Sequence, residues 1–142
     1  ISVTGVQTCA LPISTVKRQY MERRRNPILA LKESSTQSRV VQFIKVFYPN
    51  TLMFSIPNGA HTSAKNRLRL TKEGLLPGVP DLCILEKRKG FHGLFIEFKT
   101  DEGKVSPEQQ KVIAQLGANG FLCFVARHHE TAIKLIEDYL NE

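Results

Sequence analysis

The sequence predicts an α/β fold in which helices flank a mixed central sheet. Two kinds of segment alternate along the chain: helical stretches with an apolar stripe, and short apolar runs of strand length. They follow one another in the order helix, strand, strand, strand, helix, strand, helix. This order fits an α/β sandwich with a mixed sheet.

The chain is basic and has the size of one domain. Its 142 residues are enough for a single hydrophobic core. Twenty Lys and Arg residues against thirteen Asp and Glu residues give a net charge of +7, which favours a polyanionic partner such as nucleic acid. A basic protein without such a partner is the alternative that charge alone leaves open.

Cysteine usage and hydropathy indicate the compartment. The three cysteines lack the paired spacing of a metal site, and two of them lie in apolar strand-like runs. We therefore expect buried free thiols in a reducing compartment. No apolar run approaches the roughly 20 residues that span a bilayer, so we expect an intracellular protein without a membrane partner.

Residues 1–31 precede the expected domain. Residues 3–13 match, codon by codon, the translation of a common sequencing-adapter oligonucleotide, so we expect residues 1–15 to be foreign to the natural protein. Residues 16–31 are rich in Lys and Arg and are interrupted by Pro27. They fit a basic arm that grips phosphates, a truncated helix, or a solvated run of charge.

The first helix of the domain is expected at residues 32–47. Its apolar stripe consists of Val40, Val41, Ile44 and Phe47. Counting back by three and four residues places Gln37 and Glu33 on the same stripe, and a carboxylate aimed along a core face is unusual. The competing explanation is a helix cap, because Ser34 and Gln37 have the spacing of a capping box.

A short strand is expected at residues 52–56, followed by a turn-rich loop at residues 57–62. Four basic residues come next: Lys65, Arg67, Arg69 and Lys72. This stretch has the composition of a phosphate-contacting surface. His61 has no partner at metal-ligand spacing, so we interpret it as a loop residue that contacts the same partner.

Residues 82–85 and 94–98 are apolar runs separated by a polar stretch, which predicts an antiparallel hairpin centred on Lys89. Leu94, Ile96 and Phe98 are expected to face the core. In this register Asp81 lies opposite Glu97 on the other face. Like charges in such a pair are destabilising, so a further group must offset the repulsion.

Lys99 shares the face of Glu97, so two carboxylates and an ammonium converge. Taken alone, each part has a simpler explanation, a solvated ion pair for Glu97 with Lys99 and a turn for Asp81. Their joint spacing favours a site. Hard oxygen ligands with open positions suit Mg²⁺ or Mn²⁺, and a lysine beside the ion can position or deprotonate a water. The sequence therefore predicts phosphodiester hydrolysis.

The second helix is expected to begin after Ser106 and to end before Gly120. Gln109 shares the face of its apolar residues, and its spacing from Ser106 also fits a capping box. An apolar strand at residues 121–126, consistent with a buried position, and a helix at residues 130–140 complete the chain.

These motifs resemble the PD-(D/E)xK nuclease signature in the form found in VRR-NUC domains, the virus-type replication-repair nucleases. The resemblance rests on Gly-Val-Pro-Asp ending at Asp81 and on Ile-Glu-Phe-Lys ending at Lys99, and it covers residues 33–140. It extends to Glu33 with Gln37, to Pro-Asn-Gly at residues 57–59 and to Ser-Pro-Glu-Gln at residues 106–109.

The resemblance implies a restriction-endonuclease-like core in residues 32–142. It implies a Mg²⁺ or Mn²⁺ ion held by Asp81, Glu97 and the backbone carbonyl of Phe98. It makes Glu33 a further metal ligand or a water-positioning acid, with Gln37 supporting it. It also implies that Lys99 activates or positions the water and that Gln109 touches the site. The expected DNA contacts are Asn58, His61, Lys65, Arg67, Arg69 and Lys72.

The predicted function is that of a metal-dependent DNA endonuclease, of the stand-alone kind carried by phages and bacteria and located in the cytoplasm. Likeness to small members implies branched, flap or junction DNA as the substrate in DNA repair, and a homodimer as the working form. The alternatives are a non-catalytic DNA-binding module and a sequence-specific restriction-type nuclease. The joint presence of Asp81, Glu97 and Lys99 favours the nuclease over the binding module.

Overall fold

The computed structural model describes residues 36–57 and 63–141. The predictions for residues 1–35, which include the foreign segment, the basic arm and the start of the first helix, lie outside the described residues. The same holds for residues 58–62 in the loop that was expected to contact DNA. Among the described helices, none is long and apolar enough to cross a membrane.

The described strands form one mixed sheet of four strands in the order β1-β2-β3-β4. They are β1 (Met53–Ser55), β2 (Leu82–Ile84), β3 (Leu94–Phe98) and β4 (Leu122–Ala126). β2 is antiparallel to both β1 and β3, whereas β3 and β4 are parallel. The parallel pair arises because helix α4 (Pro107–Ala118) connects β3 to β4 as a crossover. The predicted α/β class with a mixed sheet is confirmed.

The β2–β3 hairpin has the predicted register. Leu82 pairs with Ile96, and this pair is symmetric about Lys89. Lys89 and Gly90 at the tip have φ values of 50° and 83°, which a two-residue hairpin turn with the twist of the strands requires. Arg88 pairs with Phe91 across this turn, and that pair is offset by one residue from the pairs of β2 with β3. The alternation of apolar residues therefore sets the strand register, and the segment between β2 and the turn holds one extra residue.

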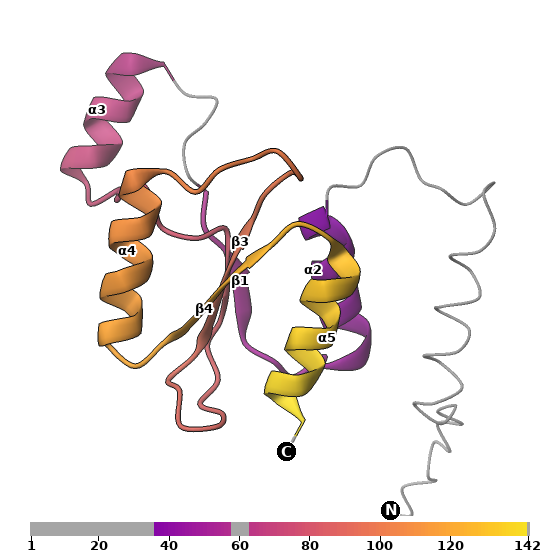
Figure 1. Cartoon of the computed structure of the whole chain (residues 1–142). Helices are drawn as coiled ribbons and strands as arrows, with labels where there is room; N and C mark the ends of the chain where they lie inside the picture. The colour runs from indigo at the N-terminus through magenta and orange to yellow at the C-terminus, as the bar shows by residue number, and fades with distance from the viewer. Residues whose placement is uncertain (1–35, 58–62, 142) are drawn as a thin grey trace, which may run out of the picture. The chain divides into compact units, whose positions relative to one another are not determined.

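Helices cover both faces of the sheet (Figure 1). Helices α2 (Thr36–Phe47) and α5 (His129–Leu140) pack together on one face, and α4 covers the other. The side chains that are most deeply buried include Val40, Ile44, Leu82, Ile84, Leu94, Ile96 and Ile136. Burying one such side chain stabilises the fold by about 1.5–3 kcal/mol. Because these residues come from α2, α5 and the strands, the face of the sheet under α2 and α5 is the main core.

A helix that the predicted order omits occupies the basic stretch. Helix α3 (Ala64–Lys72) has 9 residues and buries none of them. It therefore lacks the apolar stripe by which the other helices were found. Its local signal is the N-cap, because the side chain of Ser63 accepts a hydrogen bond from the N–H of Asn66.

Strand β4 also differs from its prediction. Its apolar composition indicated a buried strand, but only Ala126 is buried and the other residues are half-buried. β4 lies at an edge of the described sheet, next to β3 alone. Its apolar side chains pack against α4 and α5 rather than between two strands.

Candidate active site

The loop that leads into β2 touches the first turn of α4 at Gly78. Gly78 has a φ of +90°, and a Cβ at this position would lie 2.7 Å from the backbone carbonyl of Glu108. Only glycine meets both conditions, because the left-handed region and the close approach each exclude a side chain. The contact fixes where the chain enters Pro80, which is buried, and then Asp81.

Asp81 is held by three elements of the fold. Its Oδ2 accepts a hydrogen bond of 2.8 Å from the backbone N–H of Phe98. Its backbone carbonyl accepts one of 2.9 Å from the N–H of Ile56 and one of 3.5 Å from the side-chain amide of Gln37. Continuing the β2–β3 register by one residue sets Asp81 opposite Glu97, so the two carboxylates lie side by side.

Glu97 is the one buried charged side chain in the described core, with an exposed fraction of 2%. Its Oε1 receives both the Nζ of Lys99 at 2.9 Å and the side-chain amide of Gln109 at 2.5 Å. Its Oε2 is buried and has no hydrogen-bond partner in the part of the chain that the structure describes. A buried carboxylate oxygen without a partner is costly, so this atom is the natural place for a ligand.

Burial raises the pKa of Glu97 above its ordinary value. Desolvation is the largest cause, and the neighbouring charge of Asp81 acts in the same direction. The hydrogen bonds from Lys99 and Gln109 oppose it. Keeping Glu97 ionised therefore has a net free-energy cost, and a cation beside Oε2 would reduce that cost.

Gln109 combines the two roles that its sequence position left open. Its side-chain oxygen accepts from the N–H of Ser106 at 2.9 Å, and its own N–H donates to the Ser106 hydroxyl at 3.2 Å. These bonds form the capping box that begins α4. The amide group at the same end of the side chain donates to Glu97. The cap thus aims a donor at the buried carboxylate.

Lys99 completes the convergence, and 19% of its side chain is exposed. The loop that follows it is held by Arg127, which directly follows β4. Its guanidinium Nη1 donates to the carbonyl oxygens of Thr100, Asp101 and Gly103. Sequence reasoning missed Arg127, because only the parallel pairing of β3 with β4 brings position 127 next to this loop.

The remaining predicted residues fall into two groups. The basic residues Lys65, Arg67, Arg69 and Lys72 all lie on α3. Arg69 is already engaged, because Glu73 binds its Nη1 at 2.7 and 2.8 Å. The predicted ligand Glu33 and the predicted DNA contacts Asn58 and His61 lie outside the described residues.

Comparison with known proteins identifies the family of the chain. The family model described as VRR-NUC domain matches residues 17–130. The chain belongs to the VRR-NUC domain family. A solved VRR_NUC domain protein is 25% identical, with a TM-score of 0.64 over 78% of this chain and 89% of that chain. This likeness supports a restriction-endonuclease-like fold for the chain.

A second solved structure, titled VRR_NUC domain, is 21% identical and has a TM-score of 0.48. The alignment covers 75% of this chain and 99% of that chain. No curated protein matches the chain. The matched range of the VRR-NUC model includes Asp81, Glu97, Lys99 and Gln109, so the convergent side chains belong to a nuclease domain.

The donor set of this VRR-NUC domain fits a hard divalent cation. Within residues 36–57 and 63–141, no group of three or more His, Cys, Asp or Glu side chains gathers as a metal site. A Mg²⁺-type ion keeps several waters and needs only one or two protein carboxylates, which Asp81 and Glu97 supply. Oε2 of Glu97, which has no hydrogen-bond partner among the residues described, is the atom that such an ion would satisfy. The residues present therefore fit the ion.

Proposed function

We propose that this protein is an endonuclease that hydrolyses phosphodiester bonds in DNA with a Mg²⁺ or Mn²⁺ ion. The observation that carries the proposal is Oε2 of Glu97, a buried carboxylate oxygen without a hydrogen-bond partner among the described residues. It lies on a side chain whose other oxygen is held by Lys99 and Gln109. Such a carboxylate is poised for a cation and not for a structural ion pair alone.

Asp81 and Glu97 would hold the ion. The backbone carbonyl of Phe98 is a third candidate, because the N–H and C=O of one strand residue point to the same side and the N–H of Phe98 points at Asp81. Glu33 is the fourth, by family likeness. When bound, the ion polarises the scissile phosphate and neutralises charge that develops in the transition state.

Lys99 supplies the remaining chemistry from the protein. Its ammonium is bound to Oε1 of Glu97 and is partly exposed, so it can also contact a water or a phosphate oxygen of a bound substrate. There it orients the attacking water and offsets negative charge on the phosphate. Gln109 keeps Oε1 turned toward Lys99, which leaves Oε2 for the cation.

The net charge and the family extend the proposal to a substrate and a setting. A chain with a net charge of +7 attracts the polyanionic DNA backbone, and α3 carries four of its Lys and Arg residues. Family likeness favours branched or junction DNA in DNA repair, in the cytoplasm of a bacterial or phage-infected cell. A homodimer would supply two sites for two symmetric incisions.

The test is cleavage of labelled duplex, flap and four-way-junction DNA in Mg²⁺, Mn²⁺ or EDTA. Glu97→Ala and Lys99→Ala are compared with matched substitutions on α5, Glu130→Ala and Lys134→Ala. We expect metal-dependent cutting that the first pair abolishes and the second pair retains. A folded wild-type protein that binds DNA but cuts none of these substrates in either metal would replace the nuclease with a DNA-binding module.

Thermal melting provides a readout that does not depend on cleavage. A ligand present at 100 times its dissociation constant stabilises the folded state by about 2.7 kcal/mol. Mg²⁺ or Mn²⁺ should therefore raise the Tm of the wild type and of Lys134→Ala, and it should not raise the Tm of Asp81→Asn or Glu97→Ala. Equal shifts in all four proteins would reject Asp81 and Glu97 as ligands.

A further inference from the structure

Helix α3 has little to hold it within the folded chain. It has 9 residues and buries none of them, although Ser63 caps its start. Isolated helices shorter than about 12–15 residues are marginal in water, and most helices gain their stability from a packed face. A short helix without a packed face is expected to gain its stability from contact with a partner.

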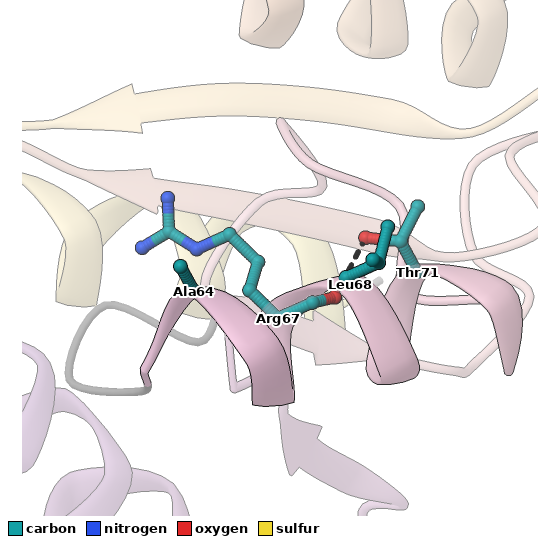
Figure 2. A pocket seen from close by; sticks show the side chains of 4 residues that line it. All are labelled: Ala64, Arg67, Leu68 and Thr71. Carbon is teal, nitrogen blue, oxygen red and sulfur yellow. Dashed lines mark hydrogen bonds between the residues drawn. The ribbon is translucent and has the colours of Figure 1, made fainter.

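One face of α3 lines a groove. Ala64, Arg67, Leu68 and Thr71 follow one another at helical spacing and line a groove of about 510 Å³ (Figure 2). Leu68 has an exposed fraction of 60%. The hydroxyl of Thr71 donates to the backbone oxygen of Arg67 at 2.9 Å, so Thr71 presents mainly its methyl group. The face is therefore apolar at its centre, with a cation at one side.

The charge of α3 selects a polyanion as the partner. Residues 64–73 carry four cations and one acid, Glu73, so the net charge is 4 − 1 = +3. Arg69 forms an ion pair with Glu73, and its Nη2 also donates a hydrogen bond of 2.9 Å to the side-chain oxygen of Asn66. Arg67 is different, because it lies on the groove face and has no ion-pair partner among the described residues.

We infer that α3 is a DNA-contact helix and that Leu68 makes the protein selective for DNA whose base stacking is interrupted; this inference rests on the proposed nuclease function. Phosphates interact with Arg67, Lys65 and Lys72, but they present no apolar surface that could bury Leu68. An exposed leucine gains from burial against base faces, which are hidden in an intact duplex and accessible at a flap, a junction or a single-stranded end.

The experiment measures equilibrium binding in EDTA to a duplex, a flap and a four-way junction of equal length. Leu68→Ala is compared with wild type and with Leu76→Ala, which truncates a leucine of similar exposure, 53%, beyond the end of α3. We expect Leu68→Ala to weaken flap and junction binding by about tenfold and to leave duplex binding unchanged. Leu76→Ala should behave as wild type.

Arg67→Ala provides the contrasting variant. It removes one phosphate contact, so it should weaken binding to all three DNAs alike and lower the slope of log K against log salt by about one. Circular dichroism and Tm values that match wild type for each variant show that the fold is retained.

Three outcomes overturn the inference: Leu68→Ala keeps the wild-type preference, it weakens all three DNAs equally, or it changes the oligomeric state and not the DNA preference. The last result would make the α3 face a contact between copies of this chain. Because DNA binding is measured in EDTA, the binding comparison does not depend on cleavage. Absent cleavage rejects the nuclease and leaves the inference about Leu68 in place, whereas an unchanged DNA preference overturns that inference and leaves the nuclease in place.

Discussion

The side-chain amide of Gln109 on α4 donates a hydrogen bond of 2.5 Å to Oε1 of Glu97 on β3. The oxygen of the same amide accepts from the N–H of Ser106 and so belongs to the capping box. One side chain therefore ties the first turn of a helix to a buried carboxylate. Any change that moves the start of α4 also moves the donor that orients Glu97.

Gln109→Glu should separate the two roles of Gln109. A glutamate keeps an oxygen for the N–H of Ser106, but it removes the donor to Glu97 and sets a second negative charge against it. We expect cleavage to fall by about 10- to 100-fold, as is common when a group that supports a metal ligand is lost. Ser106→Ala is the matched control, and it should cost about 1 kcal/mol of stability while retaining most activity. Equal activity losses in both variants would mean that Gln109 acts through the cap alone.

Gly78→Ala should damage the site more than a strained backbone alone explains. Gly74 is the control, because it also has a positive φ, +102°, but a Cβ there would meet nothing within 4 Å. Gly74→Ala should cost roughly 1–2 kcal/mol in urea unfolding, the cost of the left-handed conformation. Gly78→Ala adds the clash with Glu108, so it should lose more stability and also lower DNA cleavage. Similar stability and activity in the two variants would argue against a close approach at Gly78.

Arg127→Ala should loosen the loop that follows Lys99. The variant loses the hydrogen bonds to Thr100, Asp101 and Gly103, so trypsin should cut after the exposed Lys104 faster than in wild type. Cleavage of DNA should also fall, because this loop directly follows Lys99.

Two further variants accompany this measurement. Arg127→Lys keeps a cation with rotatable donors and should restore part of the protection. Arg69→Ala, which breaks an exposed ion pair on α3, should leave cutting at Lys104 unchanged. Wild-type protection in Arg127→Ala would show that the loop is held by other contacts.

Glu97→Gln should stabilise the metal-free protein at neutral pH. The folded-state pKa of Glu97 is raised above its ordinary value of 4.5. A group of this kind contributes most to stability below its unfolded pKa, and the contribution is lost as the pH rises through the folded pKa. In EDTA, urea unfolding from about pH 4 to about pH 8 should therefore show the wild type losing stability relative to Glu97→Gln.

Glu108→Gln tests the sign of this effect. The pKa of Glu108 is lowered, first by a backbone hydrogen bond and then by the Ser106 side chain. Its contribution is present above the unfolded pKa and is lost as the pH falls, which is the opposite trend. If both variants gain on the wild type as the pH rises, burial of Glu97 is not the cause.

Local patterns were sufficient for the hairpin and for the second helix. The pairing of Leu82 with Ile96 follows from strand alternation, because a slip of one residue would turn the apolar side chains of one strand away from the core. The start of α4 follows from Ser106, Pro107 and Gln109, whose capping geometry spans only a few residues. Such features depend on bonds between residues that are close in sequence, so the residue order specifies them.

Where the chain lacked a periodic pattern, sequence reasoning failed. Helix α3 buries none of its residues, so no stripe indicated it, and only the cap at Ser63 and the left-handed Gly74 mark its limits. The apolar run of β4 suited a central strand as well as an edge strand covered by helices. Apolar composition reports burial of side chains and does not report how many strands are neighbours.

The folded chain alone decided how the candidate site is assembled. The acids and the lysine were placed on one face by alternation, but the burial of Glu97 depends on α4 covering that face. So does its Oε2, which lacks a hydrogen-bond partner in the described part of the chain. The role of Arg127 depends on the parallel pairing of β3 with β4. These relationships join residues that are distant in sequence, and packing across the sheet, which has no local signature, brings them together.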